Sequence, residues 1–214
     1  MTPNYVPDTV PVRRALAHLR AVDPTLAAVV ARVGPYRPRL RTDGSHAAFV
    51  ARAIVYQQLS GRAAATIHGR FEQLCKPGGV SPAAIVALGD DALRGVGLSR
   101  QKIGYLRDLA NRCERGDVPI DTVHQLDDSA VIETLTRVRG VGVWTAQMFL
   151  IFRLGRPDVL PALDLGIQKA MMRAYRWRSM PTTERVLRQG ERWAPYRSVA
   201  SWYLWRSLDA EAEI

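Results

Sequence analysis

Apolar residues recur at helical spacing through most of this sequence, and strict apolar–polar alternation never continues long enough to form a strand. In one stretch, Ala64, Ile67, Phe71 and Leu74 fall on a single face of a helix. The pattern predicts an all-α fold. With 214 residues, 47% of them hydrophobic, the chain is long enough to bury the core of one large or two small domains.

Capping residues and prolines mark where the helices begin. Ser45, Ser60 and Ser99 each precede a helical segment, and Ser81-Pro82 has the form of a cap followed by a first-turn proline. Capping predicts that these segments fold as separate helices. We expect helices over 12–33 and 45–59, helices beginning at 60, 81 and 99, a helical pair within 127–154, and helices after Asp164, Pro181 and Pro195.

The charge balance points to a polyanionic partner. Lys and Arg number 30 against 20 Asp and Glu, which gives a formal net charge of +10 and favours nucleic acid. No apolar run approaches the roughly 18 residues that span a bilayer, and residues 1–9 lack the apolar core of a signal peptide. We therefore expect a soluble protein without a membrane partner, cytoplasmic at a bacterial nucleoid or nuclear in a eukaryote.

Cysteine is too scarce to build a framework or a cluster. Cys75 and Cys113 are the only two, so a disulfide scaffold and a four-cysteine zinc or iron–sulfur site are both excluded. Cys113 falls on the apolar face of a predicted helix, together with Ile103 and Leu106. We expect it to be a core residue rather than a reactive thiol.

The segment Arg139-Gly140-Val141-Gly142 lies between two predicted helices. Two glycines permit a tight chain reversal that leaves backbone N–H groups unpaired at the start of the second helix, where the helix dipole favours an anion such as a DNA phosphate. A plain helix–turn–helix reversal is the alternative. A dinucleotide-binding loop is disfavoured, because no strand precedes Gly140 and Thr145 replaces the third glycine.

The surroundings of this hairpin resemble a known family. The stretch 135–146 is followed by Leu163-Asp164-Leu165-Gly166-Ile167, and three further blocks at 53–60, 97–102 and 193–198 match in order. Together they resemble the helix-hairpin-helix, Gly/Pro-Asp superfamily of DNA base-excision glycosylases, and within it the 3-methyladenine DNA glycosylase II branch. The resemblance covers residues 45–206.

The resemblance implies a single domain over 1–214 made of two helical lobes, with the hairpin beside the cleft between them. The central lobe is expected over 45–155, with the hairpin at 128–154, and the second lobe over 1–44 plus 156–214. An N-terminal β domain, which some relatives carry, is not expected, because few residues precede Ser45. Arg139 stands where the family usually has proline, which we expect to loosen the start of the hairpin.

The implied activity is that of a monofunctional DNA glycosylase. Such an enzyme flips alkylated purines such as 3-methyladenine and 7-methylguanine out of duplex DNA and hydrolyses their N-glycosidic bond. The catalytic candidate is Asp164, whose carboxylate would stabilise an oxocarbenium-like sugar. The alternative role for Asp164 is the N-cap of the following helix, and the two roles are compatible.

Aromatic and wedge residues complete the expected site. The resemblance places Trp144 and Trp205 in the base pocket, where stacking and cation–π attraction suit a cationic base, with core packing as the alternative role. Gln58, followed by Leu59, is the candidate to fill the gap left by the flipped base. The alternative is that Leu59 is core and the glutamines cap helix ends. Relatives that cut the strand have a lysine where Trp144 stands, so no Schiff base is expected.

Backbone groups of the hairpin are the remaining candidates. No cofactor is expected for catalysis, but the resemblance implies a structural Na⁺ or K⁺ held by carbonyl oxygens, and amides that face a DNA phosphate. Arg139 and Arg197 are expected to add positive charge. The carbonyls are those of Thr136, Val138 and Val141, and the amides are those of Gly140, Gly142 and Thr145.

Two other classes of function remain open at this stage. A non-catalytic DNA-binding protein would use the hairpin only as a phosphate clamp and would need neither Asp164 nor an aromatic pocket. A general helical interaction module would show no salt-dependent affinity for DNA. The expected partner is double-stranded DNA that contains alkylated bases, bound by a monomer.

Overall fold

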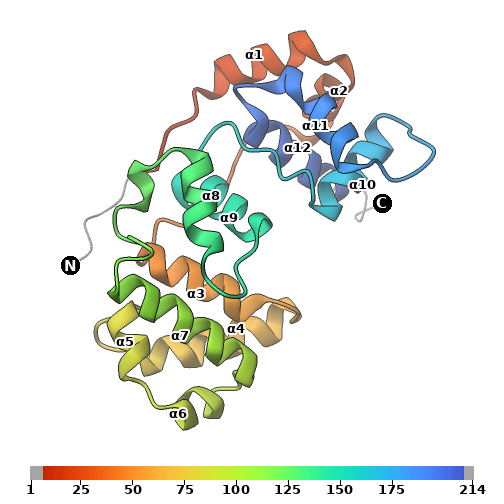
Figure 1. Cartoon of the computed structure of the whole chain (residues 1–214). Helices are drawn as coiled ribbons and strands as arrows, with labels where there is room; N and C mark the ends of the chain where they lie inside the picture. The colour runs from red at the N-terminus through yellow and green to blue at the C-terminus, as the bar shows by residue number, and fades with distance from the viewer. Residues whose placement is uncertain (1–6, 210–214) are drawn as a thin grey trace. The chain divides into compact units, whose positions relative to one another are not determined.

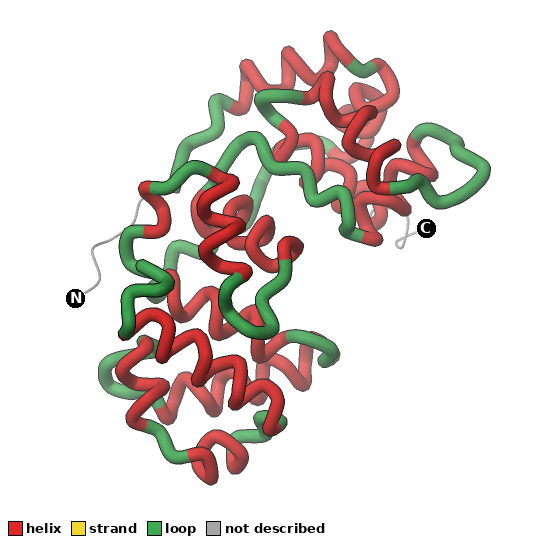
Figure 2. Tube along the Cα trace, in the orientation of Figure 1, coloured by secondary structure: helices red, strands yellow, loops and turns green. Residues whose placement is uncertain are grey.

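The structure, a computed structural model, describes residues 7–209, and these residues form helices and loops without a strand (Figure 2). The prediction of an all-α fold is therefore confirmed for this part of the chain. The chain divides into two compact units, which we call unit 1 (41–149) and unit 2 (7–40 together with 150–209). The sequence had placed the corresponding lobe at 45–155, whereas unit 1 ends at Phe149.

Unit 1 is built around α7 (Arg100–Glu114), which packs against α3 (His46–Tyr56) and α5 (Pro82–Ala87). Side chains that the structure buries completely include Phe71, Ile85 and Leu106. In the view of Figure 1, α3, α5 and α7 lie below the two helices of the hairpin. The other helices of the unit are α4 (Gly61–Leu74), α6 (Asp90–Gly95), α8 (Asp128–Thr136), α9 (Val143–Phe149) and a 3-10 turn (Val123–Gln125).

The predicted caps of unit 1 form the expected hydrogen bonds. The hydroxyl oxygens of Ser45, Ser60, Ser81 and Ser99 each accept a bond from the backbone N–H three residues later, which satisfies a donor in the first turn. Two details differ from expectation. The helix that begins after Ser45 ends at Tyr56 rather than at 59, and the short helix α6 carried too little apolar periodicity to be predicted.

Unit 2 buries the aromatic residues near the end of the chain. Trp193 and Tyr203 are fully buried, and Tyr196 and Trp202 are nearly so, which makes all four core residues. The core is closed by contacts of α12 with α10 and α2. The elements are α1 (Val12–Val22), α2 (Pro24–Val33), a π-helix (Leu150–Leu154), α10 (Leu165–Ala174), α11 (Thr183–Gly190), a 3-10 turn (Glu191–Trp193) and α12 (Arg197–Asp209).

The prediction of one helix over 12–33 was wrong, because the chain breaks at Asp23. This residue has extended backbone angles, and its Oδ1 accepts a hydrogen bond from the N–H of Leu26, so it caps α2, with Pro24 in the first turn. Its Oδ2 accepts bonds from the Tyr175 hydroxyl and the Trp193 indole. Asp23 is only 2% exposed and joins α2 to the later helices of unit 2.

Residues 7–209 contain neither a candidate membrane-spanning helix nor a candidate metal cluster. No helix there has both the length and the apolar character that crossing a membrane requires. No group of three or more His, Cys, Asp or Glu side chains in this range is placed to hold a metal ion.

Candidate functional site

The hairpin joins α8 to α9 through Gly140, whose φ of +81° lies in the left-handed region. A Cβ atom at this position would lie 2.2 Å from Cδ2 of Tyr105, so only glycine fits against that ring. Gly142 has open space around it, and its carbonyl accepts the first helical bond of α9, from Ala146. The amides in the first turn of α9, including that of Thr145, lack an acceptor within their own helix and suit an anion.

The start of the hairpin is held more firmly than the sequence suggested. The N–H of Arg139 donates a hydrogen bond of 2.8 Å to Oδ2 of Asp108, a bond that the proline usual at this position could not make. Burial raises the pKa of Asp108, but the bonds from Arg139 and Arg112 outweigh it and bring the pKa below its ordinary value. The carboxylate therefore remains charged and anchors the turn.

The turn between α3 and α4 presents the predicted wedge residues to solvent. Gln58 is exposed and has a φ of +54°, which is strained for a residue with a side chain. Leu59 is 38% exposed, so the alternative that makes it a core residue is not supported. Gln57 donates a hydrogen bond of 2.7 Å from Nε2 to the carbonyl of Gly140, which ties this turn to the hairpin.

Lys102, on α7, forms hydrogen bonds with the backbone that leads into the same turn. Its Nζ donates bonds of 2.7 Å to the carbonyl of Val55 and 2.8 Å to that of Gln57, at the C-terminal end of α3. Burial lowers the pKa of the Lys102 ammonium. Reasoning from the sequence placed Lys102 in a family block but gave it no role, because its contacts lie far away along the chain.

The predicted wedge residue Gln58 and the predicted base-pocket residue Trp144 line one pocket in unit 1. The pocket has a volume of ≈ 470 Å³. The indole of Trp144 is 45% exposed, so it is available for stacking rather than committed to the core. Arg52, which the sequence analysis did not single out, places its guanidinium 3.6 Å from the ring centroid of Tyr56. The other lining residues are Phe49, Ala53, Gln57, Thr145 and Met148.

Asp164 and Trp205 lie together in unit 2. Asp164 is the N-cap of α10, since its Oδ1 accepts a 2.8 Å bond from the N–H of Ile167. The same oxygen accepts a 2.9 Å bond from the indole N–H of Trp205. Gly166 makes room for this arrangement, because a Cβ there would lie 2.9 Å from Oδ1 of Asp164 and 3.1 Å from Cδ1 of Trp205. Capping is thus confirmed, and the carboxylate is fixed in one orientation.

The ring of Trp205 also borders a basic groove. It lies against Phe152 with centroids 5.7 Å apart and planes tilted by 32°. The groove has a volume of ≈ 980 Å³ and combines these rings with arginine side chains. Its other lining residues are Val33, Pro35, Arg37, Pro38, Arg39, Trp202 and Arg206.

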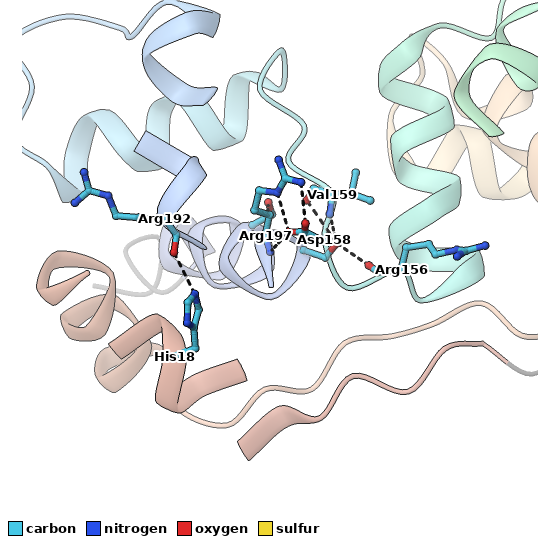
Figure 3. Close-up of polar contacts among 8 residues, drawn as sticks. His18, Arg156, Asp158, Val159, Arg192 and Arg197 are labelled. Carbon is cyan, nitrogen blue, oxygen red and sulfur yellow. Dashed lines mark hydrogen bonds and ion pairs between the residues drawn. The ribbon is translucent and has the colours of Figure 1, made fainter. Parts of the chain in front are cut away.

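A polar network holds the loop that leads to Asp164 (Figure 3). Asp158 accepts bonds of 2.7 and 2.8 Å from the guanidinium of Arg197, and its Oδ1 also accepts the Arg197 backbone N–H at the start of α12. Ser198 accepts the N–H of Val159 and donates to the carbonyl of Arg156. Burial raises the pKa of Asp158, but the bonds from Arg197 outweigh this effect and bring the pKa below its ordinary value. Arg197, expected to add charge for DNA, is instead paired with Asp158.

The surroundings of Cys113 do not activate its thiol. Burial, with the nearby charges of Asp121 and Glu114, raises the pKa of Cys113 to about 12, so its thiol stays protonated at neutral pH. This agrees with the expectation that Cys113 is a packing residue.

Comparisons with known proteins identify the family. A model of the HhH-GPD superfamily of base excision DNA repair proteins matches residues 51–195, which include the hairpin, Asp164 and the turn at Gln58. This chain belongs to the HhH-GPD superfamily. The matched residues include the turn between α3 and α4 (57–60), which we call the wedge turn after its predicted role.

Several similar proteins of the HhH-GPD superfamily are named 3-methyladenine DNA glycosylases or glycosidases. DNA-3-methyladenine glycosylase 1 of Schizosaccharomyces pombe is 34% identical over 197 residues, which cover 91% of this chain and 86% of the relative. The solved structure of the S. pombe 3-methyladenine DNA glycosylase in complex with abasic DNA matches with a TM-score of 0.79 at 35% identity, over 90% of this chain and 95% of that one. A DNA-3-methyladenine glycosidase from Bacillus halodurans matches with a TM-score of 0.84 at 32% identity, over 97% and 94%.

Proposed function

We propose that this HhH-GPD protein is a monofunctional DNA glycosylase that hydrolyses the N-glycosidic bond of alkylated purines, such as 3-methyladenine and 7-methylguanine, in duplex DNA. The observation that carries the proposal is the Asp164 carboxylate, held by Ile167 and Trp205 in a chain whose relatives are named 3-methyladenine glycosylases. A phosphate clamp without catalysis would need no carboxylate fixed in this way.

The chemistry assigned to Asp164 is electrostatic. As the base leaves, positive charge develops on the sugar, and a preorganised carboxylate near C1′ stabilises it. Two N–H donors orient Oδ1, so little reorganisation is needed when the bond breaks. A 3-alkyl or 7-alkyl purine is already cationic and leaves readily, so the proposal needs no second acid.

Reaching the base requires that it leave the stack. We assign the insertion to Gln58, with Leu59 beside it, because both are exposed at a tightly held turn. Trp144 and Trp205 supply the aromatic surfaces for the base, since an electron-rich ring attracts a cationic purine.

The DNA backbone is assigned to the hairpin amides of Gly140, Gly142 and Thr145, which contact phosphate without reading sequence. We also propose that carbonyl oxygens of Thr136, Val138 and Val141 hold a structural Na⁺ or K⁺. These donors suit a hard monovalent ion, and the Val138 oxygen, which accepts the N–H of Val141, keeps a second lone pair. We propose that the protein acts as a monomer, at the nucleoid of a bacterium or in the nucleus of a eukaryote.

The decisive experiment uses duplexes that each carry one defined lesion, scored for free base by chromatography. We expect release of 7-methylguanine and 3-methyladenine, product DNA with intact abasic sites, and no covalent adduct after borohydride treatment, because Trp144 has no amine. A protein that binds these duplexes but releases no base from any of them would be a clamp and not an enzyme. Strand cleavage without added alkali would contradict the monofunctional assignment.

A further inference from the structure

One side of α7 contacts both elements that the proposed function assigns to DNA. Lys102, Tyr105 and Asp108 are three residues apart, so they lie within about a third of the circumference of the helix. Lys102 binds the wedge turn, Tyr105 lies against Gly140, and Asp108 accepts the N–H of Arg139. The hairpin and the wedge turn are therefore held by one rigid helix in the core of unit 1.

Lys102 acts at the point where the wedge turn begins. Its ammonium reaches two carbonyls, of Val55 and Gln57, in the last turn of α3, where a helix presents unpaired acceptors and the negative end of its dipole. The next residue is Gln58, whose φ of +54° persists only where the surroundings fix it. The ammonium thus fixes the carbonyl immediately before the strained residue.

Gln57 closes the connection between the two elements. Its carbonyl accepts from Lys102, while its side-chain amide donates to the carbonyl of Gly140. A shift of the wedge turn therefore strains its bond to the hairpin, and the position of Gln58 is set relative to the phosphate-binding turn. Lys102 itself is only partly buried and reaches no pocket that the site uses.

We propose that Lys102 is a positioning residue for base flipping, which holds the Gln58 turn in its strained conformation at a fixed place beside the hairpin. The proposal rests on the proposed function and deepens it. Lys102 touches neither the base nor the sugar. Its removal should leave phosphate binding intact and slow only the steps that depend on Gln58.

The test separates flipping from binding. Lys102→Met keeps the length of the side chain but removes the charge and both hydrogen bonds. Lys102→Arg keeps the charge and the hydrogen-bond donors. Lys76→Met is the charge-matched control, because it removes one exposed lysine from the same unit. Each variant is measured for affinity to undamaged duplex, for single-turnover release of 7-methylguanine, and for the fluorescence of a 2-aminopurine placed next to the lesion.

We expect Lys102→Met to release base about 10- to 100-fold more slowly, because a displacement near 1 Å costs that much at a positioned group. The 2-aminopurine signal should fall in parallel, Lys102→Arg should recover part of the rate, and affinity for undamaged duplex should match that of Lys76→Met. In a Gln58→Ala background, Lys102→Met should add no further loss, since both act through one side chain.

Other outcomes overturn the proposal without ambiguity. If the losses from Lys102→Met and Gln58→Ala multiply, or if Lys102→Met behaves like Lys76→Met, Lys102 does not act through the wedge turn. If Lys102→Met fails to fold, Lys102→Arg decides, because it keeps the charge but moves the donors away from the two carbonyls: slow release at unchanged affinity supports the proposal, and wild-type release overturns it. If the wild type releases no base, the proposed function fails instead.

Discussion

Asp164 caps α10 through the same oxygen that Trp205 binds, and the catalytic role that we propose would be a second duty of this side chain. A cap requires only a short polar side chain, and Asn serves nearly as well as Asp. Stabilising positive charge on a sugar requires a carboxylate. The two duties can therefore be separated by a substitution that keeps shape and removes charge.

We predict that Asp164→Asn folds normally, binds lesion-containing duplex with nearly unchanged affinity, and releases base at least about 10²-fold more slowly, the usual cost of losing one preorganised electrostatic group. The loss should be larger for neutral hypoxanthine than for cationic 7-methylguanine, which needs less help to leave. Single-turnover release and thermal unfolding measure the two effects. Near-normal turnover on every accepted lesion would remove Asp164 from the mechanism.

The hairpin shows how one element depends on another that is distant in sequence. Gly140 needs its positive φ for the chain reversal, but the same residue is also packed against the ring of Tyr105 on α7. Gly142, two residues later, has no such neighbour. The two glycines of the motif therefore differ in what a methyl group would do.

We predict that Gly140→Ala lowers the free energy of unfolding by about 2 kcal/mol or more, since a positive φ alone costs an alanine about 1–2 kcal/mol and Tyr105 must also move. Gly142→Ala should cost at most about 1 kcal/mol, the loss of a tolerable N-cap. Urea unfolding gives both values, and affinity for undamaged duplex should weaken more in Gly140→Ala. Equal costs at the two positions would refute the assigned contact with Tyr105.

At the scale of the whole molecule, three carboxylates that are buried or partly buried hold segments together. Burial raises the pKa of Asp23, but hydrogen bonds from Tyr175, Leu26, Trp193 and Gln189 bring it below its ordinary value. The pKa values of Asp108 and Asp158 are lowered in the same way. Each of these groups therefore binds protons more weakly in the folded chain than in the unfolded one.

Stability should follow these carboxylates. Because a depressed pKa stabilises the fold above the unfolded value and loses that effect as pH falls through the folded value, we predict a flat free energy of unfolding from pH 7 to about 5 and a decline below about 4. Urea unfolding between pH 3 and 7 tests this. Asp158→Asn should be less stable at pH 7 but lose less on acidification. If the variant loses as much stability below pH 4 as the wild type does, Asp158 does not contribute to the pH dependence.

The surplus of 30 basic over 20 acidic residues should dominate the affinity for DNA. We predict that the logarithm of the association constant falls linearly with the logarithm of salt concentration, with a slope of about 0.9 for each phosphate contact. Titration of two undamaged duplexes of unrelated sequence should give the same slope, because phosphate contacts read no sequence. Affinity that is indifferent to salt would contradict phosphate binding by the hairpin.

Local signals in the sequence determined where several helices begin and to which family the chain belongs. Ser60 and Asp164 start their helices where the sequence predicted, because a cap bonds to the backbone three residues away and leaves a short-range pattern. The Gly-Val-Gly reversal and the blocks around it were specific enough to identify the family. Helical periodicity predicted the all-α fold, because one apolar face repeats along a single segment, but it did not reveal the division of 12–33 into two helices or the short helix α6.

Only the tertiary structure decided which distant groups meet. The break at Asp23 has a local cause, a capping residue followed by a first-turn proline, but the bonds of its carboxylate to Tyr175 and Trp193, far along the chain, appear only in the tertiary structure. The contacts of Lys102 with the wedge turn and the pairing of Asp158 with Arg197 likewise join segments far apart in sequence. A hydrogen bond between distant residues depends on where the chain has folded, and that position is fixed by the packing of the whole unit rather than by neighbouring residues.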